Sequence, residues 1–325
     1  MNETLKKIGL YGIVPVIKLD NHLQAVPLGR ALCRAGLPVA EITLRTGNAV
    51  EGIKRMKKEF PNMIVGAGTV ISTVQVDTVL SVGADFIVSP GLNPKVVKHC
   101  VDLGVPITPG CSNPSDIEAA IELGLDTVKF FPAEAAGGLP MIKAMSAPYG
   151  NMKFMPTGGL NEKNILDYLK FKKVIACGGS YMVPSELISA GEWDKITDLT
   201  KAAVKQMLGF EVMHIGINCE NQEIAGNALN LLETMFGFES KKGTGSSFVG
   251  DGIELLHAPN HEGMYLGKNG HIAIGTNFID RAVFYFENMG IKFKEDTKVY
   301  DDKGNLKTVY FENEIAGFAF HLVQK

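Results

Sequence analysis

Residues 1 to about 208 alternate short apolar runs, rich in Val, Ile and Phe, with longer stretches of helical periodicity. Several helical stretches end on a glycine, which suits the left-handed backbone position that closes a helix. The alternation predicts repeated strand–helix units. The eight predicted strands span residues 12–17, 39–44, 63–69, 86–90, 105–109, 127–132, 153–158 and 174–178.

Eight strand–helix units are the minimum for a (β/α)8 barrel, so the predicted fold of this half is α/β, a TIM barrel. A doubly wound open sheet is the structural alternative, because it is built from the same units. The even number of strands favours closure over the open sheet.

The pattern changes after an amphipathic helix predicted over residues 193–208 and a short linker at 209–211. A unit of strand, helix and strand meander then appears twice. The first copy opens at His214 and closes around Glu254, and the second opens at His271 and closes around His321. A repeat this long indicates duplication inside one α+β domain. The sequence therefore predicts two domains, residues 1–208 and 212–325.

Composition narrows the class of protein. The chain has 325 residues, 46% hydrophobic and 21% charged, with a formal net charge of −3. This balance gives no overall basic excess that would attract nucleic acid or an anionic membrane. The five cysteines form no Cys-x-x-Cys, and neither a signal peptide nor a membrane span is predicted, so we expect a cytoplasmic protein with reduced thiols. Nucleic acid and membranes are therefore not expected partners.

Lys129 has unusual neighbours for a lysine. It lies in a β-like run beside Val128, Phe130 and Phe131, whereas most lysines here lie in polar helical stretches. Apolar surroundings disfavour the charged form of a lysine, and a neutral amine facing a keto-acid forms a Schiff base. The alternative is a lysine at a strand end with its head in water.

Glu41 and Arg45 share one face of the second predicted strand by alternation, opposite the apolar Ile42. The outer face of a barrel strand packs on helices and should be apolar, so the polar face is expected to point inward, near the carboxyl end where barrel enzymes keep their sites. A structural ion pair is the alternative.

Two glycine turns follow the last two predicted strands. They are Gly158-Gly159, after Thr157, and Gly178-Gly179, before Ser180. Glycines let a backbone approach an anion closely, and the loops after strands seven and eight are the usual phosphate site of such barrels. Two further turns, Gly66–Val70 and Val88–Gly91, offer small residues to the pocket mouth.

Together these motifs make residues 1 to about 208 resemble the 2-keto-3-deoxy-6-phosphogluconate (KDPG) aldolases, class I pyruvate aldolases that also cleave 4-hydroxy-2-oxoglutarate (KHG). The resemblance covers nearly the whole half. It is carried, in family order, by Glu41-Ile42-Thr43-Leu44-Arg45-Thr46, Gly66-Ala67-Gly68-Thr69-Val70, Ser89-Pro90-Gly91, Lys129-Phe130-Phe131-Pro132-Ala133-Glu134, Pro156-Thr157-Gly158-Gly159 and Gly178-Gly179-Ser180. Cys111-Ser112-Asn113-Pro114 departs from relatives, which often carry a Thr-rich turn there.

The resemblance implies a small-molecule keto-acid as the partner, and a role for each matching residue. Lys129 would form the imine, and Glu41 would act as general acid/base through a water. The expected substrate contacts are Arg45, Thr69, Pro90 and Phe131 around the pyruvyl group, and Thr157, Gly158, Gly159, Gly179 and Ser180 toward the phosphate. The aldolase would need no metal, since the imine is the electron sink, and would assemble as a trimer. A phosphosugar isomerase or synthase that uses Glu41 as base is the alternative function.

The repeated half resembles the vicinal-oxygen-chelate family, which includes glyoxalase I, extradiol dioxygenases and bleomycin-resistance proteins. Those proteins build two βαβββ modules around a shared cavity, with metal ligands on the first and last strand of each module. The matching positions here are His214, Glu254, His271 and His321, with His321 where relatives usually have Glu. This set could hold a divalent metal. A metal-free binding or interaction module is the alternative.

Overall fold

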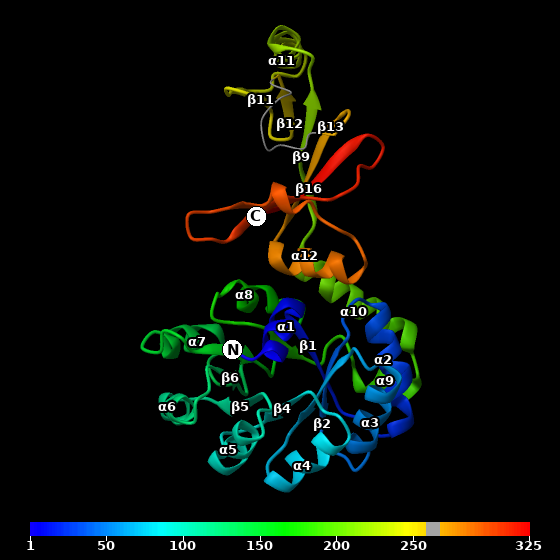
Figure 1. Cartoon of the computed structure of the whole chain (residues 1–325), viewed down its shortest axis with the longest axis vertical. Helices are drawn as coiled ribbons and strands as arrows, with labels where there is room; N and C mark the ends of the chain where they lie inside the picture. Colours follow the sequence, from blue (N-terminus) through cyan, green and yellow to red (C-terminus); the bar gives the residue numbers. More distant parts are fainter. Residues whose placement is uncertain (258–266) are drawn as a thin grey trace. The chain divides into compact units, whose positions relative to one another are not determined.

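The computed structural model describes residues 1–257 and 267–325, and the chain forms two compact units, Met1–Gln206 and Met207–Lys325 (Figure 1). Each unit carries its own eight-stranded sheet. Among the helices of the described residues, none has the length and apolar character needed to cross a membrane.

The first unit is a parallel barrel whose strands stand in consecutive order around the ring. Its strands are β1 (Ile13–Ile17), β2 (Val39–Thr43), β3 (Ile64–Gly68), β4 (Phe86–Ser89), β5 (Ile107–Cys111), β6 (Thr127–Phe130), β7 (Lys153–Pro156) and β8 (Cys177–Gly179). β8 pairs with β1, and single parallel bridges join Phe154 to Val174 and Thr157 to Gly178. The ring therefore nearly closes. This confirms the predicted TIM barrel and excludes the doubly wound sheet, whose strand order reverses.

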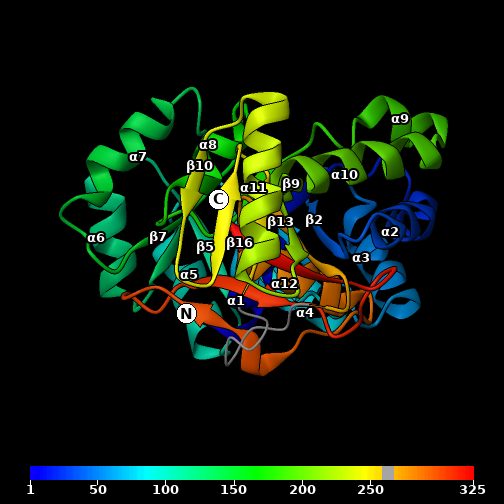
Figure 2. The ribbon, with the colours of Figure 1, turned by 90° about the horizontal axis from the view of Figure 1, so that it is seen from above.

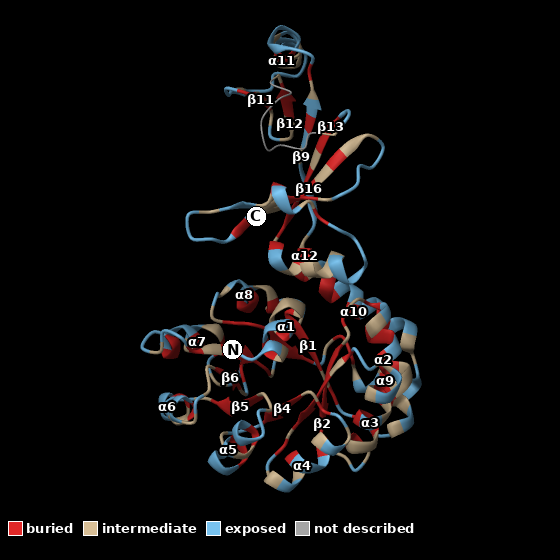
Figure 3. Ribbon diagram, in the orientation of Figure 1, coloured by how far each residue is buried: buried red, intermediate tan, exposed pale blue. Residues whose placement is uncertain are grey.

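Helices follow the strands and form the outer layer, with buried strands inside and exposed outer helix faces (Figure 3). They are α1 (Glu3–Tyr11), α2 (Ala25–Arg34), α3 (Ala49–Glu59), α4 (Thr73–Ser81), α5 (Pro94–Asp102), α6 (Pro114–Glu122), α7 (Gly138–Ser146), α8 (Ile165–Lys170), α9 (Ser185–Ala190) and α10 (Trp193–Leu208), with a 3-10 turn at His22–Gln24. α1 precedes the first strand. Its Leu5 and Ile8 pack against Val14, Val39 and Phe86, so it covers the apolar lower part of the barrel interior.

Local sequence explains several helix starts. Asn93 and Asn113 stand directly before prolines, and their side chains accept hydrogen bonds from the backbone N–H groups of Lys95 and Asp116. An Asn cap followed by Pro at the first helical position is a strong start signal. The Cys111–Pro114 segment, where the sequence departs from its relatives, therefore supplies the cap of α6.

The predicted strand limits differ most at β8. It was expected over 174–178 but begins at Cys177, because Val174 and Ile175 meet Phe154 in a single bridge with no regular ladder. β5 also lies two residues later than predicted. Alternation and apolarity mark a buried segment, but the neighbouring strand decides where pairing starts.

The second unit repeats one order of elements. The first copy is β9 (Glu211–Asn218), α11 (Gln222–Phe236), β10 (Ser240–Lys242), β11 (Ser246–Val249) and β12 (Ile253–Leu256). The second is β13 (Gly270–Thr276), α12 (Ile279–Asn288), a 3-10 turn at Glu295–Thr297, β14 (Val299–Tyr300), β15 (Leu306–Tyr310) and β16 (Phe318–Gln324). Both copies are βαβββ modules, as predicted.

The two modules join through their first strands. The sheet order is β10-β11-β12-β9-β13-β16-β15-β14, in which β9 and β13 are antiparallel and each pairs in parallel with the last strand of its own module. α11 lies beside β11 and β12, where Ala225 and Leu229 pack on Val249 and Leu255 (Figures 1 and 2). The opening and closing strands of both modules thus occupy the centre of one sheet.

Candidate active site and candidate metal site

Lys129 and Glu41 meet inside the barrel. Lys129 lies on β6 and is 5% exposed, and Glu41 lies on β2 and is 1% exposed. The Nζ of Lys129 is 3.5 Å from Oε1 of Glu41 and 5.0 Å from the ring centroid of Phe131. A strand-end lysine with its head in water is therefore excluded. An amine and a carboxylate at this distance in a buried site can exchange a proton through one small bridging molecule.

Glycines on β3 make room for the carboxylate. A Cβ on Gly68 would lie 2.2 Å from Oε1 of Glu41, and one on Gly66 would lie 2.3 Å from the ring of Phe86. Gly66 also pairs with Glu41 in the ladder. Any side chain at position 68 would therefore displace Glu41. The Gly66-Ala67-Gly68 run thus makes room for Glu41 inside the barrel, a role beyond the pocket mouth that the sequence predicted.

Several buried polar atoms of the first unit have no hydrogen-bond partner among the described residues, and they include Oε2 of Glu41, Oγ1 of Thr108 and Oγ1 of Thr157. A buried polar group without a partner is costly, and a bound water or substrate would satisfy it. Thr43, on the same face as Glu41, donates to the carbonyl of Ile17 at 2.9 Å and is already satisfied. Thr108 was missed from the sequence. Strand alternation alone would have set it on the face of the 105–109 run opposite Ile107.

A cavity of about 400 Å³ opens at the carboxyl ends of β1, β2, β6, β7 and β8. Most of the predicted substrate contacts line it: Arg45, Phe131, Thr157, Gly158, Gly159, Gly179 and Ser180. Lys129 and Glu41 are not among its lining residues, but the Nζ of Lys129 lies 5.0 Å from the ring centroid of Phe131, which does line it. Thr69 and Pro90 are not among its lining residues either. The cavity therefore joins the predicted anion turns to Arg45 and Phe131.

Lys18 and Ser185 are polar cavity residues that were not anticipated. Lys18, which directly follows β1, adds a cation to the lining and pairs with Asp20 at 2.8 Å, and Ser185 adds a hydroxyl. The position of Lys18 at the carboxyl end of a barrel strand could have indicated a site residue, but the polar residues that follow it resemble an ordinary loop. Arg45 and Lys18 thus place two basic side chains in the lining, of which Lys18 is paired with Asp20.

The backbone is unusual where the turns meet the cavity. Gly158 and Gly159 have φ of 106° and 80°, a region that L side chains seldom occupy. Thr69 adopts φ of 60°, which is rare for a β-branched residue. Strain of this kind is held in place by surrounding structure and is common at ligand sites.

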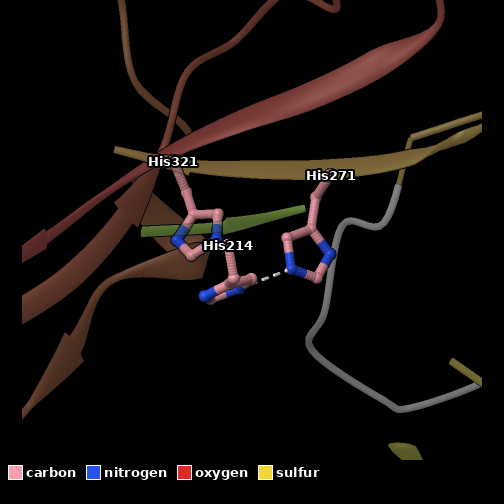
Figure 4. Close-up of side chains that lie close together, drawn as sticks. All are labelled: His214, His271 and His321. Carbon is pink, nitrogen blue, oxygen red and sulfur yellow. Dashed lines mark hydrogen bonds between the residues drawn. The ribbon is translucent and has the colours of Figure 1, made fainter. Parts of the chain in front are cut away.

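In the second unit, three histidines converge from three strands. His214 is on β9, His271 on β13 and His321 on β16, and one ring nitrogen from each lies within 4.8 Å of the others (Figure 4). The register explains the meeting, because Ala273 pairs with His214 on one side and with His321 on the other. The fourth predicted position, Glu254, joins them, with Oε2 3.2 Å from Nε2 of His271 and 3.5 Å from Nε2 of His214.

Three ring nitrogens of this cluster lack hydrogen-bond partners among the described residues. His271 and His321 are 2% and 5% exposed, and Nδ1 of His271 and both nitrogens of His321 find no hydrogen-bond partner among the described residues. Nε2 of His214 lies 2.9 Å from Nε2 of His271 (Figure 4). Tyr310 stacks on His321 with ring centroids 4.5 Å apart. Such rings are normally anchored by a hydrogen bond or a metal ion.

The protonation states suit a cation. Burial, and then repulsion from His271 and His214, lowers the pKa of His321 to about 3, and burial followed by His271 lowers the pKa of His214. Burial opposes ionisation of Glu254, but hydrogen bonds with His271 and Ser246 outweigh it and lower the pKa of that carboxyl. Neutral imidazoles and an ionised carboxylate are the forms that bind metal.

Comparison with known proteins bears on the first unit. The family model KDPG and KHG aldolase matches residues 3–199. A 2-dehydro-3-deoxy-phosphogluconate aldolase of Haemophilus influenzae is 48% identical over 202 residues, which cover 62% of this chain and 95% of that protein. The KHG/KDPG aldolase of Escherichia coli is 42% identical over 193 residues, covering 59% and 91%.

A solved structure is also similar. The crystal structure of KDPG aldolase from Legionella pneumophila, with pyruvate captured at low pH as a covalent carbinolamine intermediate, is 37% identical. The match covers 62% of this chain and 98% of that one, with a TM-score of 0.60. The family match ends at residue 199, before the second unit begins.

Proposed function

The chain belongs to the KDPG and KHG aldolase family, and from this premise we propose that its barrel cleaves KDPG to pyruvate and glyceraldehyde 3-phosphate, with KHG as a second substrate that yields pyruvate and glyoxylate. It is a class I aldolase, a carbon–carbon lyase that works through a covalent lysine imine without a metal. The observation that carries the assignment of residues is the buried Lys129 at 3.5 Å from Glu41.

Lys129 attacks the C2 carbonyl of the keto-acid, and loss of water from the carbinolamine gives a protonated imine. Glu41, acting through a water, takes the proton of the C4 hydroxyl. The C3–C4 bond breaks, its electron pair enters the imine as an enamine, and the aldehyde leaves. Glu41 then returns a proton to C3, and hydrolysis releases pyruvate. One carboxylate serves both transfers because they move the proton in opposite directions.

Arg45 is the proposed partner of the substrate carboxylate. Its side chain is exposed to the cavity and makes no ion pair among the described residues, so its planar fork is available. Phe131, 5.0 Å from the lysine nitrogen, would pack on the pyruvyl carbons. Thr69 and Pro90 would complete this end of the site as neighbours of the keto group, and Thr157 would contact the substrate on the side of β7.

The phosphate is assigned to the other end of the cavity. Gly158, Gly159, Gly179 and Ser180 would bind it through backbone N–H groups and the serine hydroxyl. Lys18 would add charge. Gly179 has room for a methyl group, since a Cβ there would touch the ring of Tyr181 at 3.4 Å, an ordinary contact. Gly179→Ala should therefore fold while altering the phosphate end.

A substrate panel tests the assignment. The whole chain is assayed for pyruvate release from KDPG and from KHG, with Gly179→Ala beside the wild type. We expect both substrates to be cleaved and the variant to raise KM several-fold more for KDPG, because KHG has no phosphate. Pyruvate release from neither substrate would contradict the proposal. An isomerase or synthase barrel that uses Glu41 as base would release none, and the buried amine of Lys129 gives it no support.

For the second unit we propose a vicinal-oxygen-chelate domain that binds one divalent metal ion through His214, Glu254, His271 and His321. The repeated βαβββ order and the unpartnered imidazole nitrogens support it. Three imidazoles and a carboxylate suit Zn, Ni, Fe or Mn, and bound metal would orient and polarise a small oxygen ligand. Metal analysis of the whole chain after growth with these ions tests it. A metal-free protein would favour a binding module instead.

We further propose that the aldolase domain comprises residues 1–208 and the second domain 212–325, and that the barrels associate as a trimer. The division between the compact units falls beside this boundary. Light scattering of the purified whole chain would give three times the mass of one chain. A monomer would contradict the trimer without affecting the assignment of the active site.

A further inference from the structure

A buried tyrosine reaches back from α8 to the segment that follows the imine strand. Tyr168 is 2% exposed, and its hydroxyl donates a hydrogen bond to Oε1 of Glu134. Burial, and then this hydrogen bond, raises the pKa of Tyr168, so its hydroxyl stays protonated and acts as the donor. Glu134 itself is exposed, so without Tyr168 its carboxylate would be free to move.

Glu134 supports the glycine turn after β7. Its backbone N–H donates to the carbonyl of Gly158 at 3.1 Å, and Ala133 donates to the carbonyl of Thr157 at 2.8 Å. A Cβ on Gly159 would lie 2.7 Å from both Cβ and Cγ of Glu134. The turn therefore rests directly on the stem of this side chain.

The same turn is fixed on its other side. The carbonyl of Gly159 accepts hydrogen bonds from the side-chain amides of Asn161 and Asn164, at 3.3 and 3.2 Å. Gly158 and Gly159 line the cavity, whereas Glu134 is not among its lining residues. The carboxylate is thus held behind the turn, away from the space that the substrate occupies.

The negative charge of Glu134 makes its position important for phosphate binding. A free carboxylate beside the turn would repel a phosphate, and a loosened stem would let the turn shift. We infer that the Tyr168–Glu134 hydrogen bond positions the Gly158–Gly159 turn for phosphate and so sets the preference for phosphorylated over unphosphorylated keto-acids. This inference rests on the proposed function of the turn. Tyr168 and Glu134 act as positioning residues, since neither lines the cavity.

The test compares kcat/KM for KDPG with kcat/KM for KHG. Tyr168→Phe should lower the ratio of the two about tenfold, through KM for KDPG, because it removes one hydrogen bond to a charged group. Adding Glu134→Gln to Tyr168→Phe should restore much of the ratio, because the amide keeps the stem and removes the repelling charge. Tyr149→Phe is the matched control, since Tyr149 donates to Glu118 at 2.9 Å in an exposed pair, and its ratio should stay at the wild-type value.

An unchanged ratio in Tyr168→Phe, or no recovery in the double variant, would overturn the inference. Binding of inorganic phosphate, measured by calorimetry, gives a readout that needs no cleavage. We expect it to weaken about tenfold in Tyr168→Phe and to be unchanged in Tyr149→Phe, and equal affinity in all three proteins would overturn the inference. Absence of pyruvate release from both substrates in the wild type is a separate outcome, which contradicts the proposed aldolase and not the phosphate positioning.

Discussion

The barrel and the second unit both bury ionisable side chains, but the two groups of side chains differ in the partners that they find within the protein. In the barrel, the Nζ of the buried Lys129 lies 3.5 Å from Oε1 of the buried Glu41, so each group has the other as a partner. In the second unit, Glu254 faces His214 and His271, while both nitrogens of His321 are unpartnered among the described residues. The comparison indicates that the reacting amine of the barrel has a partner within the protein and leaves Oε2 of Glu41 for a water or substrate, whereas both nitrogens of His321 lack a partner in the described part of the chain until a ligand binds.

The largest effect is expected from removing the amine. Lys129→Ala should lower cleavage of KDPG and KHG at least about 10⁴-fold, because it removes the buried amine that forms the imine. Circular dichroism and metal content should match the wild type, since the second unit has its own sheet. Retained cleavage in this variant would contradict the role of Lys129 and leave Glu41 as the candidate base of another reaction.

Glu41→Gln separates imine formation from proton transfer. The amide keeps the size and hydrogen bonding of the carboxylate but cannot exchange a proton at neutral pH, so cleavage should fall about 10²–10⁴-fold. Exchange of the methyl protons of pyruvate, followed by NMR in heavy water, should slow by a similar factor. Unchanged exchange would make Glu41 structural and the barrel pair a simple ion pair.

Removing a metal-binding side chain should weaken metal binding by the second unit, and removing the metal should leave aldol cleavage by the barrel unchanged. His271→Ala should lower the affinity for a divalent ion at least about 10²-fold, since it deletes a direct ligand. His99→Ala is the matched control, because His99 pairs with Asp77 at 2.7 Å in the barrel. Chelators should leave aldol cleavage at its full rate. Equal metal content in the two variants would show that the histidine cluster does not bind the metal.

The smallest effect concerns backbone strain. Among the described residues, each unit has one residue other than glycine with a positive φ. Thr69 and Ala316 have φ of 60° and 54°. Replacing either by Gly should relieve strain and raise the free energy of unfolding by up to about 1 kcal/mol. Thr69→Gly should also lower kcat/KM, whereas Ala316→Gly should not. Denaturant unfolding and kinetics measure both, and equal kinetics would remove Thr69 from the proposed site.

The two units also differ in what the sequence could predict. In the barrel, alternation correctly oriented Glu41 inward, and the apolar neighbours of Lys129 predicted its burial. In the second unit, the repeat marked His214, Glu254, His271 and His321 as matching positions without fixing how their strands pair, and the three imidazoles converge with Glu254 beside two of them. The first prediction rests on the two-residue alternation of a strand, and the second rests on internal duplication. Both patterns indicate directly where a side chain lies in a sheet.

The parts that were missed depend on contacts between distant segments. Lys18 and Thr108 look like ordinary loop and strand residues, and only closure of the barrel gives them a site. Tyr168 meets Glu134 across 34 positions of the chain, through a helix whose own pattern marks Tyr168 simply as apolar. The late start of β8 was decided by its partner strand. Local pattern carries no information about such pairs.

The most direct test of the central claim maps the covalent bond. The wild-type protein is incubated with pyruvate and sodium borohydride, digested, and its peptides are analysed by mass spectrometry. The account predicts one carboxyethyl group per chain, on Lys129, present in Glu41→Gln and absent from Lys129→Ala. A wild-type protein that gains no adduct, or gains it on another lysine, would contradict the assignment of the barrel as an aldolase site built around Lys129.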